Sequence, residues 1–158
     1  NNTPGVIYTK VVAGDKLSIT IAPKGFGSEN KSGVKMLVPA DGVEGVKKAV
    51  MEIVQHAGPN PCPPEVVGVG IGGTMDQAAL LSKKALTRPI DQRHAMPEYA
   101  KLESELLEMI NKTGIGPQLG GTTTALAVNV EWGATHIAGL PVAVTICCHA
   151  LRHAHRVL

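Results

Sequence analysis

The sequence predicts a single α/β domain in which three or four helices pack on a mixed β-sheet. Short apolar runs typical of buried strands alternate with segments whose apolar residues recur at helical spacing. No internal repeat, linker or low-complexity segment divides the 158 residues, so we expect one domain over residues 1–158. Hydrophobic residues make up 44% of the chain and aromatic residues only 3%, so aliphatic side chains must form the core.

Two strands are expected near the start of the chain. Residues 6–12 and 17–22 are rich in β-branched side chains and flank Gly14-Asp15, a turn-forming pair. This pattern predicts a hairpin. The polar, glycine-bearing stretch 24–32 follows, and we expect it to form an ordered functional loop before a short strand over residues 34–38.

The middle of the chain predicts a helix, a strand and a second helix. Apolar residues recur at helical spacing over residues 42–56, with Asp41 available as N-cap and Gly58-Pro59 as the stop. An apolar strand is expected over residues 66–71. The next helix then begins after Gly72-Gly73, with Thr74 as its N-cap, and runs to about Leu86.

The last third of the chain predicts one helix and two strands. The helix covers residues 97–111 and is followed by Gly114, a typical residue beyond a helix end. Residues 125–130 and 141–147 have the composition of buried strands. The histidine-rich tail from His149 onward is expected to be helical.

Composition excludes several classes of partner. The net charge is only +2, and no run of Lys and Arg interleaves with aromatic residues, so we expect no nucleic-acid partner. No apolar stretch reaches eighteen residues and the first residues lack the pattern of a signal peptide, so we expect no membrane span and a cytoplasmic protein. The first residue is not Met, and we expect the chain to be part of a longer protein.

Residues 68–73 match the G-x-G-x-x-G pattern after a strand and before a helix, which is the setting of a dinucleotide fingerprint. Residues 87–91, however, lack the pattern of a second parallel strand that ends in a ribose-binding acid. A close-packed turn or an anion-facing helix N-terminus explains the glycines as well, and a nucleotide-binding module remains the less favoured alternative.

The three cysteines occur at two distant positions in the sequence. Cys62 lies between Pro61 and Pro63, while Cys147 and Cys148 are adjacent and cannot pair with each other without severe strain. Thiolates are the soft ligands of iron–sulfur clusters, although a free cysteine is often only a small buried hydrophobe. Sequential strand residues point to opposite faces, so at most one of the adjacent pair should face a given site.

Two further segments carry candidate chemistry. His136 precedes the last buried strand and suits an acid/base or substrate-binding role, although a lone histidine is more often structural or exposed. Gly120-Gly121 and the three threonines from Thr122 offer hydroxyl and N–H groups that could hold a carboxylate, and they fit the start of a strand equally well.

Taken together, these segments resemble the α region of class I, iron–sulfur-dependent fumarases and the related L-tartrate dehydratase α subunits. The resemblance covers nearly the whole chain in family order. It rests on Asn2-Thr3-Pro4, Lys24-Gly25-Phe26-Gly27-Ser28-Glu29-Asn30-Lys31-Ser32, Cys62-Pro63-Pro64, residues 68–74, Gly114-Ile115-Gly116-Pro117, residues 120–125, and His136 through Cys148-His149-Ala150.

The resemblance implies a [4Fe-4S] cluster held by three cysteines, with one iron open to the oxygen atoms of the substrate. Two of the three ligands map onto this chain, as Cys62 and as Cys148, and Cys147 falls where the family needs no thiol. His136 corresponds to the active-site histidine. The implied substrate-binding residues are Lys24, Gly25, Gly27, Ser28 and Thr122.

The implied activity is the reversible hydration of fumarate to L-malate, and the close alternative is dehydration of tartrate or another hydroxy diacid. The first cluster ligand of the family lies in a Cys-Gln-Asp-Thr-Gly motif that this chain lacks, and Phe26 replaces a glycine of the family loop. The expected partners are therefore the N-terminal part of the α subunit, a β subunit or β domain, and a small dicarboxylic acid. A homodimer is also compatible, and the isolated chain should be inactive.

Overall fold

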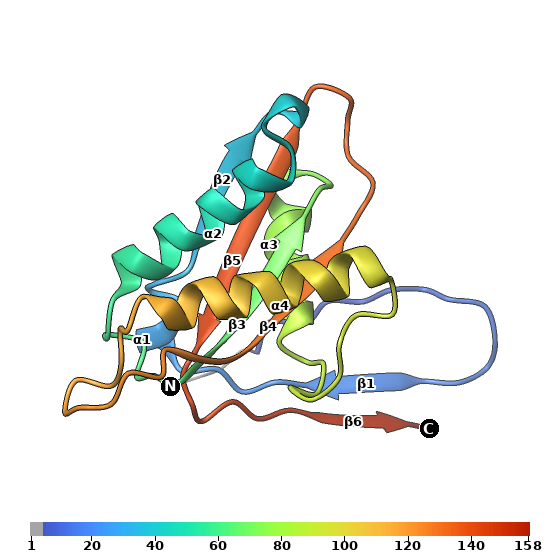
Figure 1. Ribbon diagram of the computed structural model, residues 1–158. Helices are drawn as coiled ribbons and strands as arrows, with labels where there is room; N and C mark the ends of the chain where they lie inside the picture. The colour runs from blue at the N-terminus through green and yellow to red at the C-terminus, as the bar shows by residue number, and fades with distance from the viewer. Residues whose placement is uncertain (1–4) are drawn as a thin grey trace.

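The computed structural model describes residues 5–158 and contains a four-stranded mixed sheet with the strand order β2-β5-β3-β4 (Figure 1). β3 and β4 are parallel, and β5 runs antiparallel to both β2 and β3. The predicted fold class is confirmed. The strands of this sheet are β2 (Gly33–Leu37), β3 (Glu65–Ile71), β4 (Ala125–Trp132) and β5 (Leu140–Cys147).

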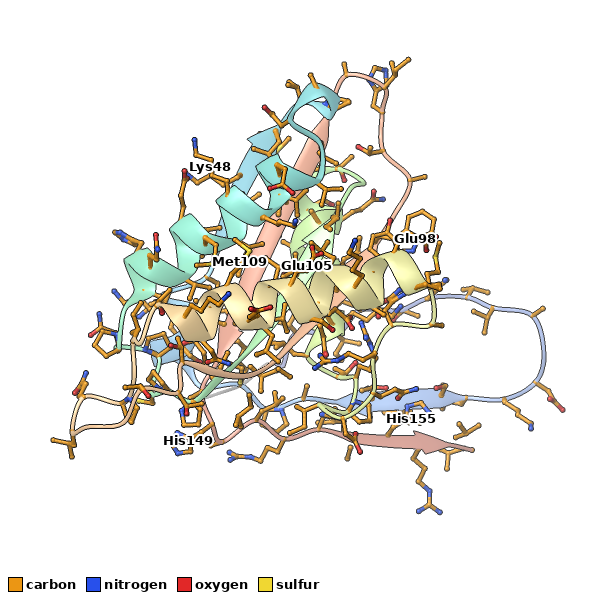
Figure 2. All side chains as sticks on the ribbon, in the orientation of Figure 1. Lys48, Glu98, Glu105, Met109, His149 and His155 are labelled. Atoms are coloured by element: carbon orange, nitrogen blue, oxygen red, sulfur yellow. The ribbon has the colours of Figure 1, made fainter. Side chains whose placement is uncertain are left out.

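Helices cover both faces of the sheet. α2 (Gly42–Ala57) and α4 (Pro97–Lys112) lie on one face, α3 (Met75–Ala85) lies on the other, and α1 (Phe26–Glu29) is a single turn near the end of β5 (Figure 1). The larger core forms between α2, α4 and the sheet, and charged residues such as Lys48 and Glu105 lie on the outer sides of these helices (Figure 2). The core side chains are almost entirely Val, Ile, Leu and Ala, as the composition predicts.

The expected strands and helices of the sheet are confirmed to within about two residues at their ends, but one helix begins differently. Asp41 stands at the N-cap position of α2 without capping it, because its carboxylate accepts the Val38 N–H at 2.9 Å across a 3-10 turn (Pro39–Asp41). Thr74 is the N-cap of α3, and its N–H donates to Gln77 Oε1 at 3.1 Å.

The glycines of the G-x-G-x-x-G pattern serve close packing of α3 on β3. A Cβ on Gly68 would lie 2.1 Å from the Ser82 carbonyl oxygen, and one on Gly70 would lie 2.0 Å from that of Ala78. The N–H groups of Gly72 and Gly73 donate to backbone carbonyls of the β4–β5 region. These two N–H groups are therefore not free to hold a diphosphate, which argues against the nucleotide-binding alternative.

The predicted hairpin is wrong. Residues 6–12 form no strand, and β1 (Ser18–Ile21) pairs antiparallel with β6 (Ala154–Val157), in the tail that we expected to be helical. The alternation of Leu17 to Ile21 marked a strand correctly, but a strand pattern does not specify its partner. β1 and the last strand of the chain therefore lie side by side in a separate two-stranded ribbon (Figure 1).

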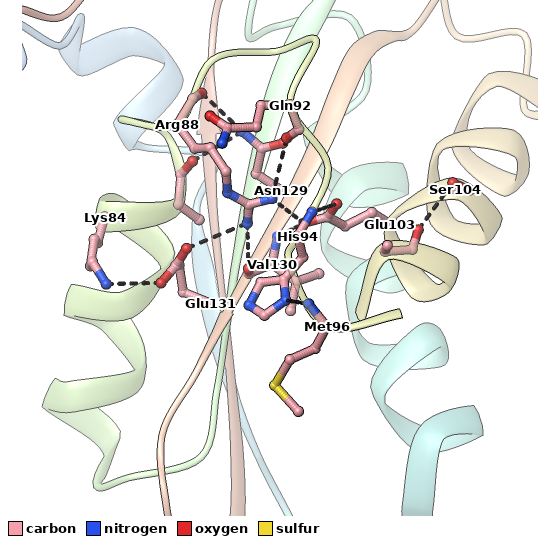
Figure 3. A network of polar contacts seen from close by, with 12 residues as sticks. Lys84, Arg88, Gln92, His94, Met96, Glu103, Ser104, Asn129, Val130 and Glu131 are labelled. Carbon is pink, nitrogen blue, oxygen red and sulfur yellow. Dashed lines mark hydrogen bonds and ion pairs between the residues drawn. The ribbon is translucent and has the colours of Figure 1, made fainter. Parts of the chain in front are cut away.

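A buried ion pair anchors the connection between α3 and α4. Glu103 on α4 is fully buried, and its Oε1 accepts hydrogen bonds from Arg88 Nη1 at 2.7 Å and the Val130 N–H at 2.8 Å (Figure 3). Its Oε2 accepts the His94 N–H at 3.0 Å. One carboxylate thus joins α4, the 86–96 connection and β4.

No helix among residues 5–158 is both long and apolar enough to cross a membrane.

Replacing Glu103 with leucine should lower the free energy of unfolding by about 3 kcal/mol or more, because Arg88 loses its buried partner and two backbone N–H groups lose their acceptor. Denaturant titration measures this loss. The matched control is Glu108→Leu on the same helix, where an exposed pair with Lys112 is removed and the change should stay within about 0.5 kcal/mol. Equal losses would contradict the anchoring role.

Candidate active site

The loops that carry Cys62 and Cys148 meet at one end of the sheet. The Cys62 carbonyl oxygen accepts the His149 backbone N–H at 3.4 Å and lies 3.1 Å from His149 Nδ1. This contact follows from strand register, because Val66 of β3 pairs with Cys147 of β5. His149 lies at this end, below the sheet in the view of Figure 2. The structure therefore brings together the two segments that the sequence identified separately.

Cys62 has an unusual backbone and an accessible side chain. Its φ of 63° lies in the left-handed region, which residues other than glycine rarely adopt. The residue is exposed, and its Sγ lies 3.9 Å from the Asn60 carbonyl oxygen. Strained residues of this kind persist where the surrounding structure holds them and are frequent at functional sites. The two contacts with His149 help to keep Cys62 in this backbone conformation.

The adjacent cysteines differ in environment. Cys147 is 2% exposed and packs with Val66, Leu86 and Ala127, so it is a core residue. Burial raises the pKa of its thiol, with the Lys24 charge acting in the opposite direction. Cys148 follows the last residue of β5 and is only partly buried. Of the two, Cys148 has the thiol that remains free of the core.

The Lys24 loop approaches the same end of the sheet. Lys24 Nζ donates to Ser28 Oγ at 3.1 Å and lies 3.1 Å from Glu29 Oε2, while Lys83 of α3 pairs with the same carboxylate. Burial alone would raise the pKa of Glu29, but the hydrogen bonds from Lys83 and Lys24 outweigh it and hold that pKa below its ordinary value. Two lysine ammonium groups therefore converge at one carboxylate beside β5.

The glycines of this loop leave its surface open. A Cβ on Gly25 or Gly27 would meet nothing within 4 Å, and neither residue has a positive φ. Ser28 is 5% exposed and donates to the Gly25 carbonyl oxygen at 3.0 Å, so its hydroxyl supports the loop from inside. Neither packing nor backbone conformation within the described chain requires glycine at 25 or 27, so the two residues leave room for another molecule to approach.

Thr122 belongs to the loop before β4, which lies at the cysteine end of the sheet (Figure 1). The end of that loop is fixed, because Thr124 donates its N–H to Asn111 Oδ1 at 3.0 Å and accepts the Glu65 N–H at 2.8 Å. Thr122 itself is exposed. Its hydroxyl is therefore accessible at the end of the sheet that also holds Cys62.

His136 lies at the opposite end of the sheet. It sits in the loop between β4 and β5, where its Nδ1 accepts the Ala138 N–H at 3.1 Å and the neighbouring Thr135 bonds to Gly73. The eight-residue strand β5 separates it from Cys148, a length of roughly 20 Å or more. The structure does not bring His136 together with the cysteines of the same chain.

Glu65 is a buried acid beside the cysteine loops that was not predicted from the sequence. It begins β3, three residues after Cys62, and it is completely buried. Neither carboxylate oxygen has a hydrogen-bond partner among the described residues. Desolvation raises the pKa of Glu65 to about 8. The only sequence signal was an acid at the head of an otherwise apolar strand.

A shallow cleft continues from His149 along the sheet. Basic groups dominate its polar residues, which are Arg152, His149 and His153 opposite a single acid, Asp91. This composition suits an anionic ligand. The apolar part of the wall is formed by Val66, Pro89, Ile90, Leu126 and Leu151.

The thiols of Cys62 and Cys148 have the chemistry of iron–sulfur ligands, but they are two of the three cysteine ligands that the resemblance implies. Among residues 5–158, no group of three or more His, Cys, Asp or Glu side chains is arranged to hold a metal ion. The donor set therefore fits part of a cluster site, and any further donor would come from outside the described residues.

The fold brings the loops of Cys62 and Cys148 together at one end of the sheet. A domain of this kind can supply soft sulfur donors and a lysine-bearing loop to a larger site. Over residues 1–157 the chain matches the model of a family described as Fumarate hydratase (Fumerase). The chain therefore belongs to the fumarate hydratase family, which confirms the resemblance drawn from the motifs. One of those motifs, Asn2-Thr3-Pro4, lies outside the residues that the structure describes.

Individual relatives are also similar over most of the chain. The "Putative L(+)-tartrate dehydratase subunit alpha" of Methanocaldococcus jannaschii is 54% identical over 140 residues, which cover 88% of this chain and 49% of the relative. The L(+)-tartrate dehydratase subunits alpha of Escherichia coli strain K12 and Shigella boydii serotype 4 are each 39% identical over 153 residues, or 96% of this chain and 50% of the relative. The chain thus spans about half the length of these relatives.

The burial of Glu65 predicts a pH-dependent stability. The folded-state pKa of about 8 lies above the ordinary 4.5, so the folded protein binds more protons than the unfolded chain between these values. Stability should fall as the pH rises from about 4.5 to about 8, by up to about 5 kcal/mol. Denaturant titrations across this range measure the slope, which Glu65→Gln should remove.

Glu52→Gln is the matched control for this experiment, because Glu52 is exposed on α2 and forms only a surface pair with Lys35. That variant should keep the wild-type slope. A Glu65→Gln protein with the same pH dependence as the wild type would contradict the assignment of the slope to Glu65.

Proposed function

We propose that this chain is part of a hydro-lyase that adds water to, or removes it from, a four-carbon dicarboxylic acid. The observation that carries the proposal is the contact between Cys62 and His149 in a member of the fumarate hydratase family, because it brings the loops of two thiol-bearing residues to one end of the sheet. Cys62 and Cys148 would hold a [4Fe-4S] cluster together with a third cysteine from the remaining part of the subunit.

Two substrates are supported by different observations. The family description and the motifs favour reversible hydration of fumarate to L-malate. The names of the similar relatives favour dehydration of L(+)-tartrate. Both reactions make or break a C–O bond next to a C–H bond between two carboxylates, so one arrangement of protein groups serves either.

The cluster, when bound, supplies a Lewis acid for the hydroxyl and carboxylate oxygens of the substrate. The chain's own residues then have the task of positioning the diacid. Lys24 brings a positive charge to the cysteine end, Gly25 and Gly27 leave room for close approach, and the accessible hydroxyl of Thr122 can donate to a carboxylate. Ser28 shapes the loop through its bond to Gly25. The base that takes the carbon-bound proton lies outside the described residues.

His136 remains a predicted catalytic residue, but it cannot act on a substrate held at Cys62 and Cys148 of its own chain. If it contacts substrate, it does so at a site that another chain or another copy completes. The homodimer and the β subunit expected from the sequence are the two sources of such a surface. The relatives are named as alpha subunits, which supports an assembly with a second kind of subunit.

Replacing Cys148 with serine in the complete enzyme should abolish turnover and remove the visible absorbance and bound iron of the reconstituted cluster. The control is Cys147→Ser, where a core thiol is changed without loss of a ligand, so iron content and turnover should persist with a modest loss of stability. Equal loss of iron in both variants would refute the assignment of Cys148. Retention of iron in both would refute it as well.

Assays of the complete, anaerobically reconstituted enzyme with fumarate, L-malate and L(+)-tartrate should separate the two substrates by at least about tenfold in kcat/KM. We expect a selective enzyme because tartrate carries a second hydroxyl, and a site that pairs this group leaves buried polar atoms unpaired with malate. Absence of turnover with all three diacids, in a preparation that contains its cluster, would contradict the proposed reaction class.

A further inference from the structure

The ribbon formed by residues 17–21 and 154–158 has no covering layer in the described chain. Every residue of β1 and β6 is exposed, so neither face of the ribbon is covered. The Leu17 and Leu158 backbones exchange hydrogen bonds of 3.2 and 2.8 Å, which closes the ribbon at one end. In Figure 1 the ribbon and the long loop that precedes β1 stand beside the four-stranded sheet and extend away from it.

An isolated two-stranded ribbon is marginally stable in water, so this one needs a surface to pack against. Its side chains support that expectation, because the ribbon and residues 6–12 carry a run of exposed apolar residues. A concentration of exposed apolar residues is typical of an interaction site. The exposed residues are Val6, Ile7, Tyr8, Val11, Val12, Leu17, Ile19, Ile21, Val157 and Leu158.

The charge of this surface argues against a second copy as its occupant. Residues 6–12, 17–21 and 154–158 contain one lysine, one arginine and one histidine, which are Lys10, Arg156 and His155, and no acid. Self-association through this surface would bring like charges together, which is unfavourable. The surface instead fits a partner that is apolar at its centre and carries carboxylates at its rim.

We propose that the ribbon and residues 6–12 dock onto the other half of the same subunit. The relatives supply the argument, because this chain spans only 49–50% of their length and a comparable length of subunit must be placed against it. A covalently joined half is present at high effective concentration, so it reaches an unpaired apolar surface before any separate chain does. The proposal rests on family membership and does not depend on the chemistry proposed for the cysteines.

The test places a photo-crosslinking amino acid, p-benzoylphenylalanine, at Ile19 or at Val157 of the complete subunit, which is expressed as a mixture of unlabelled and ¹⁵N-labelled protein. After irradiation, mass spectrometry identifies the linked peptides. We expect crosslinks from both positions to peptides of the other half, joined within one isotopic species. Links between labelled and unlabelled chains would show a second copy, and links to a β subunit would show that partner. Either result, or no crosslink from Ile19 and Val157, would overturn the proposal.

The control carries the same amino acid at Val43, an exposed residue in the first turn of α2 outside the ribbon. Its crosslinks to the other half should be at least about tenfold weaker than those from Ile19, and equal yields would overturn the proposal. Far-ultraviolet circular dichroism reports whether each variant keeps its fold. Because Ile19 and Val157 lie on different strands, one position still decides the question if the other disturbs folding.

Discussion

The pairing of β5 with β3 is the constraint on which the candidate site depends. Val66 pairs with Cys147, so the chain that leaves β5 passes the loop that enters β3, and the Cys62 carbonyl oxygen meets His149. A shift of one residue in this register would turn Cys147 out of the core and move Cys148 away from Cys62. The close packing of α3 on Gly68 and Gly70 helps to fix the register, because the sheet cannot slide beneath a helix whose backbone it touches.

The two ends of the sheet have different properties. The cysteine end combines accessible thiols, a lysine-bearing loop with open glycines, and Glu65, a buried acid with no hydrogen-bond partner among residues 5–158. The other end carries His136 on a loop. A buried carboxylate without a hydrogen-bond partner is costly, and its presence agrees with the proposal that other polypeptide segments complete the cysteine end.

Much of this arrangement could be predicted from the sequence. The long periodic segments of α2, α3 and α4 and the apolar runs of β3, β4 and β5 were clear, and the distance between His136 and Cys148 was implicit because a predicted strand separates them. The partner of β1 could not be predicted, since alternation marks a strand but not its neighbour. Glu65 was missed because a single acid before an apolar run is typical of a turn. A third cluster ligand could not be located, because the motif that would carry it is absent from the sequence.

The central claim is that Cys62 and Cys148 bind the same iron–sulfur cluster. Anomalous diffraction at the iron absorption edge, from anaerobically grown crystals of the complete enzyme, tests it directly. The account predicts iron at bonding distance from Sγ of both residues in one cluster, with Cys147 Sγ in the core. Iron bound to only one of the two residues, to Cys147, or at the His136 end of the sheet would contradict it.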